Sequence, residues 1–168
     1  MTMKPINIYL IIAIVLAGCN QKQKKENFQY ERVQENSSEV IQNTDLQNTV
    51  ILNSNDAMLF DKKVIKVSYG ENITLTLNHV GKIGKDFMGH NFVLLKQGVD
   101  VDAFAQRAIL ARDNEYIPEG DEIIVTTKML GGGESDTIVF DAPEPGKYIF
   151  ICTFPGHYQL MRGEFIVI

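Results

Sequence analysis

The stretch from Cys152 to Met161 constrains this chain more than any other feature. It places a thiol, an imidazole and a thioether at Cys152, His157 and Met161, directly after the strand-like run Tyr148–Ile151. These are soft and borderline donors that copper prefers, and a trigonal His₂Cys set with a weak axial Met is the pattern of a blue-copper electron-transfer site. Such a set needs a second imidazole, and His90, in a Gly-His-Asn context, is the obvious candidate. Because three of the donors follow one strand and the other comes from a distant strand, the fold itself must fix most of the geometry.

From about Gln47 the chain changes to short β-rich runs separated by turn residues, a pattern typical of a sandwich or barrel. Within the run Ile73–Asn78, apolar and polar residues alternate with a period of two, which predicts one buried face. The predicted strands are Thr49–Asn53, Val64–Ser68, Ile73–Asn78, Asn91–Leu95, Ile123–Thr127, Asp136–Phe140, Tyr148–Cys152 and Glu164–Ile168.

One segment breaks the β pattern. Val101, Phe104, Ala105, Ala108 and Ile109 recur at helical spacing, and Asp100 is a suitable N-cap residue. The sequence therefore predicts an all-β fold with one short helix inserted between strands.

The N-terminus carries a targeting signal of its own. Ile6–Ala17 is a short apolar run behind Lys4, which resembles the h-region of a secretory signal peptide and is short for a membrane span. It ends in Leu16-Ala17-Gly18-Cys19, which resembles a bacterial lipobox, so residues 1–18 are predicted to be a lipoprotein signal peptide and Cys19 the lipidated residue. The alternative is an ordinary signal peptide in which Cys19 is incidental.

The polar composition of residues 19–46 predicts a flexible tether between the lipidated Cys19 and a folded domain at 47–168. As a random coil this tether would reach roughly 30 Å. The chain holds only two cysteines, so a lipidated Cys19 would leave Cys152 as an unpaired thiol that metal ligation would protect. The net charge of −5 carries no basic block, so nucleic acid is not an expected partner.

Residues 47–168 resemble the azurin family of cupredoxins nearly end to end. The similarity is carried by Asn55–Phe60, Met88–Leu94, Gly131–Glu134 and the string from Cys152 to Gly163. It implies a Greek-key β-sandwich of about eight strands that holds one copper ion at one end. Carried over residue by residue, His90, Cys152 and His157 would be the strong ligands, Met161 the axial ligand, and the Gly89 carbonyl an opposite, weak donor.

The resemblance also assigns roles around the metal. Asn91 would tie the two ligand loops together and Phe154 would offer a backbone N–H to the cysteine sulfur, as Asn91 would too. Met58, Met88, Phe154 and Pro155 match an apolar docking patch around the outer edge of the His157 ring, which is expected to reach the surface. Three further residues, Ile83, Phe87 and Leu160, match the same patch, although Phe87 and Leu160 could equally be core.

Two more positions complete the resemblance. His79 matches a histidine near the site that is not a ligand. The positions of the disulfide usual in azurins hold Gln47 and Gly70 here, so that bridge is absent.

The leading function is one-electron transfer by a single copper ion, by an electron carrier rather than an enzyme. Its expected partners are redox proteins such as c-type cytochromes and terminal reductases or oxidases. The expected location is the cell envelope, with a lipid anchor in the outer membrane and the domain facing the periplasm. Copper storage or delivery is the alternative, whereas a multicopper enzyme would need more imidazoles than the three histidines of this chain.

Overall fold

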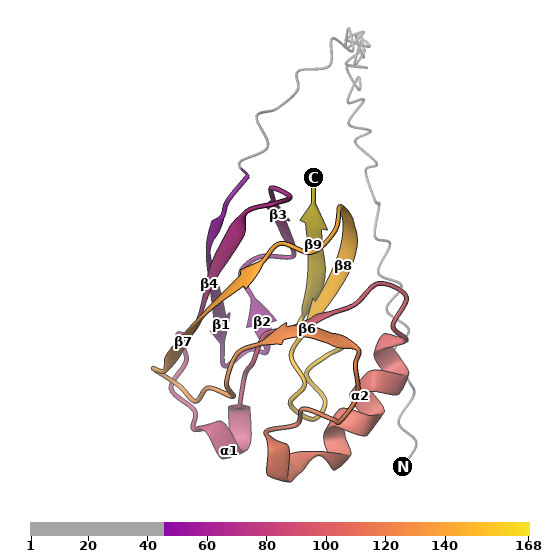
Figure 1. The fold of residues 1–168 in the computed structure, drawn as a ribbon. Helices are drawn as coiled ribbons and strands as arrows, with labels where there is room; N and C mark the ends of the chain where they lie inside the picture. The colour runs from indigo at the N-terminus through magenta and orange to yellow at the C-terminus, as the bar shows by residue number, and fades with distance from the viewer. Residues whose placement is uncertain (1–45) are drawn as a thin grey trace, which may run out of the picture. The chain divides into compact units, whose positions relative to one another are not determined.

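The computed structural model describes residues 46–168, so the predictions for the signal peptide, for the tether up to Asp45 and for Cys19 lie outside the described residues. The described part folds into two β-sheets packed face to face (Figure 1). One sheet has the order β2-β1-β4-β7, formed by Leu59–Phe60, Thr49–Asn55, Asn72–His79 and Ser135–Asp141. The other has the order β3-β9-β8-β5-β6, formed by Val64–Val67, Arg162–Val167, Gly146–Ile151, Val93–Leu95 and Ile123–Thr126. The predicted all-β sandwich is confirmed.

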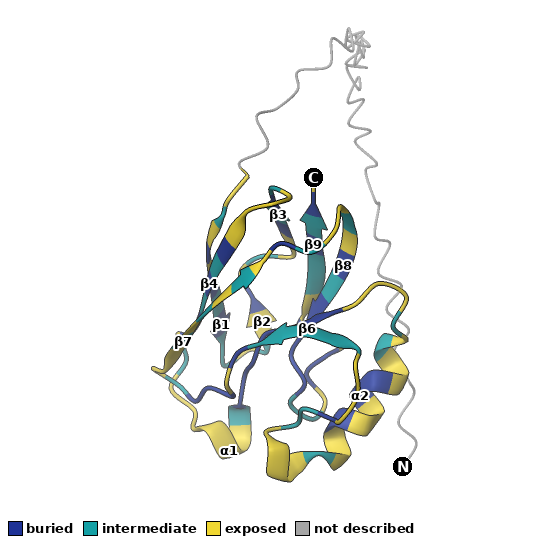
Figure 2. Ribbon diagram, in the orientation of Figure 1, coloured by how far each residue is buried: buried dark blue, intermediate teal, exposed yellow. Residues whose placement is uncertain are grey.

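The core lies between the two sheets, as period-two alternation requires. Strand β4 shows this most clearly, because Ile73, Leu75 and Leu77 are fully buried while the residues between them are half-buried. Opposite them lie large apolar side chains of the second sheet, Leu94, Phe150 and Phe165, together with Phe92 directly before β5. Figure 2 shows buried residues, in dark blue, in strands of both sheets.

Strand β5 is buried on both faces, and the inserted helix is the reason. Helix α2, Val101–Leu110, places Phe104 and Ala105 against Val93 and Leu95 on the outside of the second sheet. The helix begins as predicted, because the Asp100 side chain accepts hydrogen bonds from the backbone N–H groups of Asp102 and Ala103, both at 3.1 Å.

The structure corrects the strand and helix counts. The described residues contain nine strands, because the two-residue strand β2 was not predicted. They also contain a four-residue helix α1, Lys85–Met88, and a 3₁₀ turn η1, Arg112–Asn114, beside the single helix expected. None of the helices in the described part is long and apolar enough to cross a bilayer.

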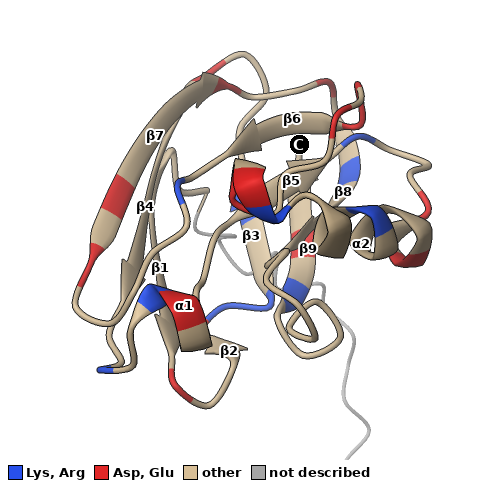
Figure 3. Cartoon of the chain, turned by 90° about the horizontal axis from the view of Figure 1, so that it is seen from below, with Lys and Arg blue, Asp and Glu red and all other residues tan. Residues whose placement is uncertain are grey.

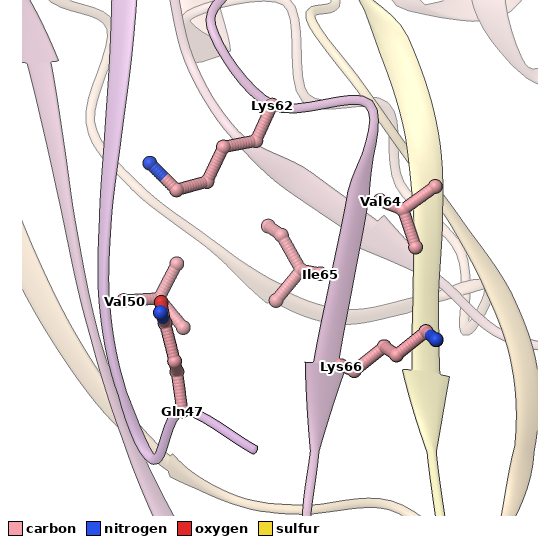
Figure 4. Close-up of a pocket in the computed structure, with 6 residues that line it drawn as sticks. All are labelled: Gln47, Val50, Lys62, Val64, Ile65 and Lys66. Carbon is pink, nitrogen blue, oxygen red and sulfur yellow. The ribbon is translucent and has the colours of Figure 1, made fainter. Parts of the chain in front are cut away.

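A shallow groove of about 280 Å³ opens between β1 and β3, where the two sheets part. The Lys62 side chain extends over this space and Ile65 projects into it (Figure 4). Val50 and Ile65 at its floor are core residues, 1% and 3% exposed. Since no cluster of metal donors lines this groove, the chemistry predicted from the sequence lies elsewhere.

Candidate metal centre

The register of β5 against β8 brings the two predicted ligand segments together. Val93 pairs with Ile151 in an antiparallel ladder, so the residues just before β5 lie alongside those just after β8. The Asn91 amide secures this junction, because its Oδ1 accepts from the Thr153 backbone N–H at 2.8 Å and its Nδ2 donates to the Thr153 hydroxyl at 2.7 Å. Both residues are buried, so this pair fixes one ligand segment against the other without competition from water.

Cys152 is the centre of the cluster. Its sulfur is fully buried and lies 3.7 Å from His157 Nδ1 and 3.7 Å from the Gly89 carbonyl oxygen. Burial raises the pKa of the Cys152 thiol to about 12, while the backbone N–H groups of Asn91 and Phe154 act in the opposite direction. These two N–H groups face the sulfur from the two ligand segments.

His90 is buried with both ring nitrogens lacking any hydrogen-bond partner in the described part of the chain. Its ring lies 5.2 Å from the His157 ring and 4.1 Å from the His79 ring, measured between centroids. Burial lowers the pKa of His90 to about 3, helped by its two histidine neighbours. An imidazole held neutral, buried and unpartnered carries a desolvation cost that a bound cation would remove.

The loop from Cys152 to Met161 closes on itself through backbone hydrogen bonds. The Met161 N–H donates to the His157 carbonyl at 2.7 Å, and the Cys152 N–H donates to the Met161 carbonyl at 2.9 Å. Gly156 allows the turn, because its φ of 82° lies in the left-handed region that favours glycine. These backbone bonds restrain the positions of Cys152, His157 and Met161 relative to one another.

His157 has almost no exposed surface. The residue is 3% exposed, so the ring edge expected at the surface is at most a narrow strip. Phe154 packs beside it, with ring centroids 4.7 Å apart. Burial lowers the pKa of His157 to about 4, so this ring is also neutral at physiological pH.

Gly89 approaches the cluster closely because it has no side chain. A Cβ atom there would lie 2.8 Å from each of Met129 Sδ, Phe154 Cδ2 and the Lys85 carbonyl oxygen. A glycine is therefore needed for the Gly89 carbonyl to reach the Cys152 sulfur.

His79 and Asp56 form a second pair, which links His90 to the segment before α1. His79 Nε2 is 3.3 Å from Asp56 Oδ1, too poorly aligned to count as a hydrogen bond. Asp56 also accepts from the backbone N–H groups of Lys82 and Ile83, at 2.8 Å and 3.3 Å. The Lys82 N–H is the main reason why the pKa of Asp56 is lowered. This carboxylate therefore ties the segment that leads into α1 to the histidine packed on His90.

The predicted docking residues lie at two levels of exposure. Phe87, Leu160 and Ile83 are 80%, 50% and 40% exposed, so the core alternative for Phe87 and Leu160 is wrong. The remaining members, Met58, Met88, Phe154 and Pro155, are half-buried. Phe87 lies three residues before His90, and Leu160 lies directly before Met161. Their exposed side chains therefore place apolar surface at the end of the sandwich that holds the candidate ligands.

The donor set fits a soft or borderline metal that accepts a weak fourth ligand. Residues 46–168 contain no three His, Cys, Asp or Glu side chains that form a ready-made metal cluster. The contacts described above bring one thiol, two neutral imidazoles and a carbonyl close together. The thioether of Met161 is fully buried in the same core cluster as Cys152. A thiolate with imidazoles and a thioether suits copper, whereas oxygen-preferring cations such as Mg²⁺ would find one carbonyl at most.

Comparison with known proteins agrees with this donor set. Residues 46–168 match the family described as copper binding proteins, plastocyanin/azurin family. This chain belongs to that family. One copper ion is therefore its cofactor.

Members of the plastocyanin/azurin family align over most of the described part. Azurin-1 from Alcaligenes xylosoxydans xylosoxydans is 41% identical over 120 residues, which cover 68% of this chain and 93% of azurin-1. The azurin of Bordetella pertussis is 45% identical over 114 residues, covering 64% of this chain and 75% of its own. The crystal structure of dithionite-reduced auracyanin from Roseiflexus castenholzii superposes with a TM-score of 0.67 at 38% identity, over 73% of this chain and 98% of auracyanin.

Several residues that shape the centre were not assigned a role from the sequence. Thr153 pairs with Asn91, and Asp56 accepts hydrogen bonds from the segment that leads into α1. Met129 and Tyr116 also pack around Gly89 and Phe154. Only the position of Thr153 directly after Cys152 offered a signal in the sequence.

Proposed function

We propose that this protein carries single electrons through a blue-copper centre. His90, Cys152 and His157 would be the strong ligands, Met161 the weak axial ligand, and the Gly89 carbonyl a distant donor. The observation that carries the proposal is the Cys152 sulfur, buried 3.7 Å from both His157 Nδ1 and the Gly89 oxygen, with the unpartnered His90 ring beside His157. The bound copper ion would supply the chemistry by alternating between its two oxidation states.

The protein part of such a function is to keep the ligand positions constant. The loop hydrogen bonds, the Asn91–Thr153 pair and the close packing at Gly89 all act on the ligand segments. Because these contacts join protein groups to one another, they would restrain the ligands in both oxidation states, and little reorganisation would accompany a change of charge, which favours fast electron transfer.

The surroundings of the sulfur support a tuned redox site. Two backbone N–H groups, from Asn91 and Phe154, face Sγ, whereas Pro155 has no N–H to offer. Hydrogen bonding and apolar surroundings at the cysteine sulfur set the potential of such sites.

Electrons would leave through His157 and the apolar surface around it. Phe154 packs on the His157 ring at 4.7 Å, and the exposed Phe87, Ile83 and Leu160 extend the apolar surface. Exposed apolar patches mark contact sites. The partners proposed are redox proteins such as c-type cytochromes and terminal reductases or oxidases.

Visible spectroscopy tests the proposal most directly. The full chain, prepared free of metal, is titrated with Cu(II) beside a Cys152→Ser variant. An intense blue thiolate-to-copper band should saturate at one equivalent, bleach with ascorbate and be missing from Cys152→Ser. Tight copper binding without a blue band would reject electron transfer and favour copper storage or delivery.

Burial of the ligands favours electron transfer over delivery. His90, Cys152 and Met161 are fully buried and His157 is 3% exposed, so no ligand is offered directly to a receiving protein. A delivery protein needs labile, accessible donors for ligand exchange. If delivery were the function, copper should pass to a chelator within seconds.

We further propose that Cys19 is lipidated and anchors the domain at the outer membrane, facing the periplasm. The lipobox-like Leu16-Ala17-Gly18-Cys19 supports this proposal. Mass spectrometry of the mature protein should find an acylated Cys19 at its N-terminus, and Cys19→Ser should release the protein from membranes. An unmodified N-terminus at another residue would contradict the anchor.

A further inference from the structure

Lys63 connects the start of β3 to the end of the ligand loop. Its Nζ donates to the Leu160 carbonyl at 2.6 Å and lies 3.4 Å from the Arg162 carbonyl. Its own backbone carbonyl accepts from the Glu164 N–H at 2.8 Å, within the β3–β9 pairing. Figure 3 shows the basic β2–β3 connection beside the basic start of β9, at the end of the sandwich that carries α1.

The carbonyl that Lys63 reaches immediately precedes Met161. The N–H groups of Leu160 and Met161 both donate to the His157 carbonyl, so that side of the turn is secured within the loop. The Leu160 carbonyl is different, since in residues 46–168 Lys63 is the only hydrogen-bond donor found for it. This ammonium therefore ties the Met161 end of the loop to a different part of the chain.

We infer that Lys63 is a positioning residue for Met161, the proposed axial ligand. It restrains the peptide between Leu160 and Met161, and with it the distance of the thioether from Cys152 and His157. This inference rests on the proposed function where it concerns bound copper. The hydrogen bond from Lys63 to the Leu160 carbonyl involves protein atoms alone, so its effect on the loop can be tested without metal. A charge-assisted hydrogen bond is the strongest kind available to an exposed lysine.

Lys62 provides a matched control on the same connection. It carries the same charge one residue earlier, but its Nζ lies 3.5 Å from Asp61 Oδ2 and its chain extends over the groove between β1 and β3 (Figure 4). A general effect of positive charge would appear at both lysines. A positioning effect would appear at Lys63 alone.

The first experiment measures amide hydrogen exchange in the metal-free full chain. Exchange at Leu160, Met161 and Arg162 should be about fivefold faster in Lys63→Met than in the wild type, the factor expected from one exposed charge-assisted hydrogen bond. Lys63→Arg, which can still donate to the same carbonyl, should restore most of the protection. Lys62→Met should leave these amides unchanged.

The second experiment uses the copper-loaded proteins. Lys63→Met should alter the relative intensities of the visible bands, which report the axial interaction, and should release copper to a chelator about fivefold faster. Unchanged exchange and spectra in Lys63→Met, or equal changes in Lys62→Met, would overturn the inference. A wild type without a blue band would instead overturn the proposed function, and the metal-free exchange result would still decide the role of Lys63.

Discussion

Asp56 is a single side chain that contacts both the segment before α1 and the histidine packed on the buried ligand candidate His90. Its carboxylate accepts two backbone hydrogen bonds from the segment before α1 and lies against His79, whose ring packs on His90. The same carboxylate lies where a Cβ of Gly81 would be, so a side chain at position 81 would displace Asp56 from its present position. The position of the segment beside His90 therefore depends on Asp56, which is not one of the proposed copper ligands.

This arrangement predicts a pH dependence. The pKa of Asp56 is lowered in the folded state, mainly by the Lys82 N–H, so the unfolded chain binds a proton here more readily than the folded chain. The stabilisation is therefore present above the unfolded pKa of about 4 and is lost as pH falls through the lower, folded pKa. Urea unfolding of the metal-free protein should show Asp56→Asn less stable than wild type at pH 7, with the difference shrinking below about pH 4.

Asp86→Asn is the control, because Asp86 is an exposed carboxylate on the neighbouring helix α1. It should change stability little at either pH. A difference between Asp56→Asn and wild type that stays constant down to pH 2 would contradict the role given to the charge.

At the scale of secondary structure, the Asn91–Thr153 pair joins the start of β5 to the end of β8. Both side chains are buried, so removing one partner leaves polar groups without water. Asn91→Ala should lower the free energy of unfolding of the metal-free protein by about 1–3 kcal/mol, measured by urea denaturation. Because the residues touch, a double-mutant cycle with Thr153→Val should give a coupling of at least ~0.5 kcal/mol.

The pair of half-buried Thr76 and exposed Thr137, with hydroxyls 2.9 Å apart, offers the comparison. Thr76→Val should change stability by no more than ~0.5 kcal/mol. If Asn91→Ala cost no more than that, the junction of the two ligand segments would have to be held by something else.

The elements that could be predicted from the sequence are those with a local pattern. The alternation of Ile73, Leu75 and Leu77 predicts β4, and Asp100 marks the start of α2. Strand β2 has only two residues, too few to show a period in the sequence. It follows Met58, whose φ of 57° is rare for a non-glycine residue. Helix α1 has four residues and no side-chain cap. Neither leaves a readable signal.

The same distinction holds within the candidate site. Cys152, His157 and Met161 are close in sequence, so their spacing predicts a shared role for these donors. The contacts of Lys63 with Leu160 and of Asp56 with Lys82 join segments far apart in sequence. Such contacts depend on strand register, which a single sequence does not specify for short strands.

At the scale of the whole molecule, the metal donors are part of the core of the sandwich. Cys152 and Met161 belong to the same buried cluster as Phe92 and Leu130, so the donors are packed as core residues in their own right. We expect the metal-free protein to keep its far- and near-UV circular dichroism. Copper should then raise the melting temperature, since a ligand bound only by the folded state adds ~4 kcal/mol at a free concentration 1,000 times its Kd.

Differential scanning calorimetry of the two forms tests this expectation, with Cys152→Ser as a variant in which the copper-dependent increase should be largely lost. Reductant should not shift the metal-free transition, because Cys152, the cysteine of the described part, forms no disulfide. Loss of near-UV dichroism on metal removal would mean that copper is needed for folding as well as for redox chemistry.

The position of β3 at the edge of its sheet has a consequence for biosynthesis. Among the described residues its one neighbour is β9, which is synthesised well after β3, and the donors from Cys152 to Met161 immediately precede β9. An emerging chain therefore displays the β3 edge and the His90 segment long before their partners exist. The donor cluster can close only once β9 has been made, so a chain that stops before Arg162 should have no closed site to fill.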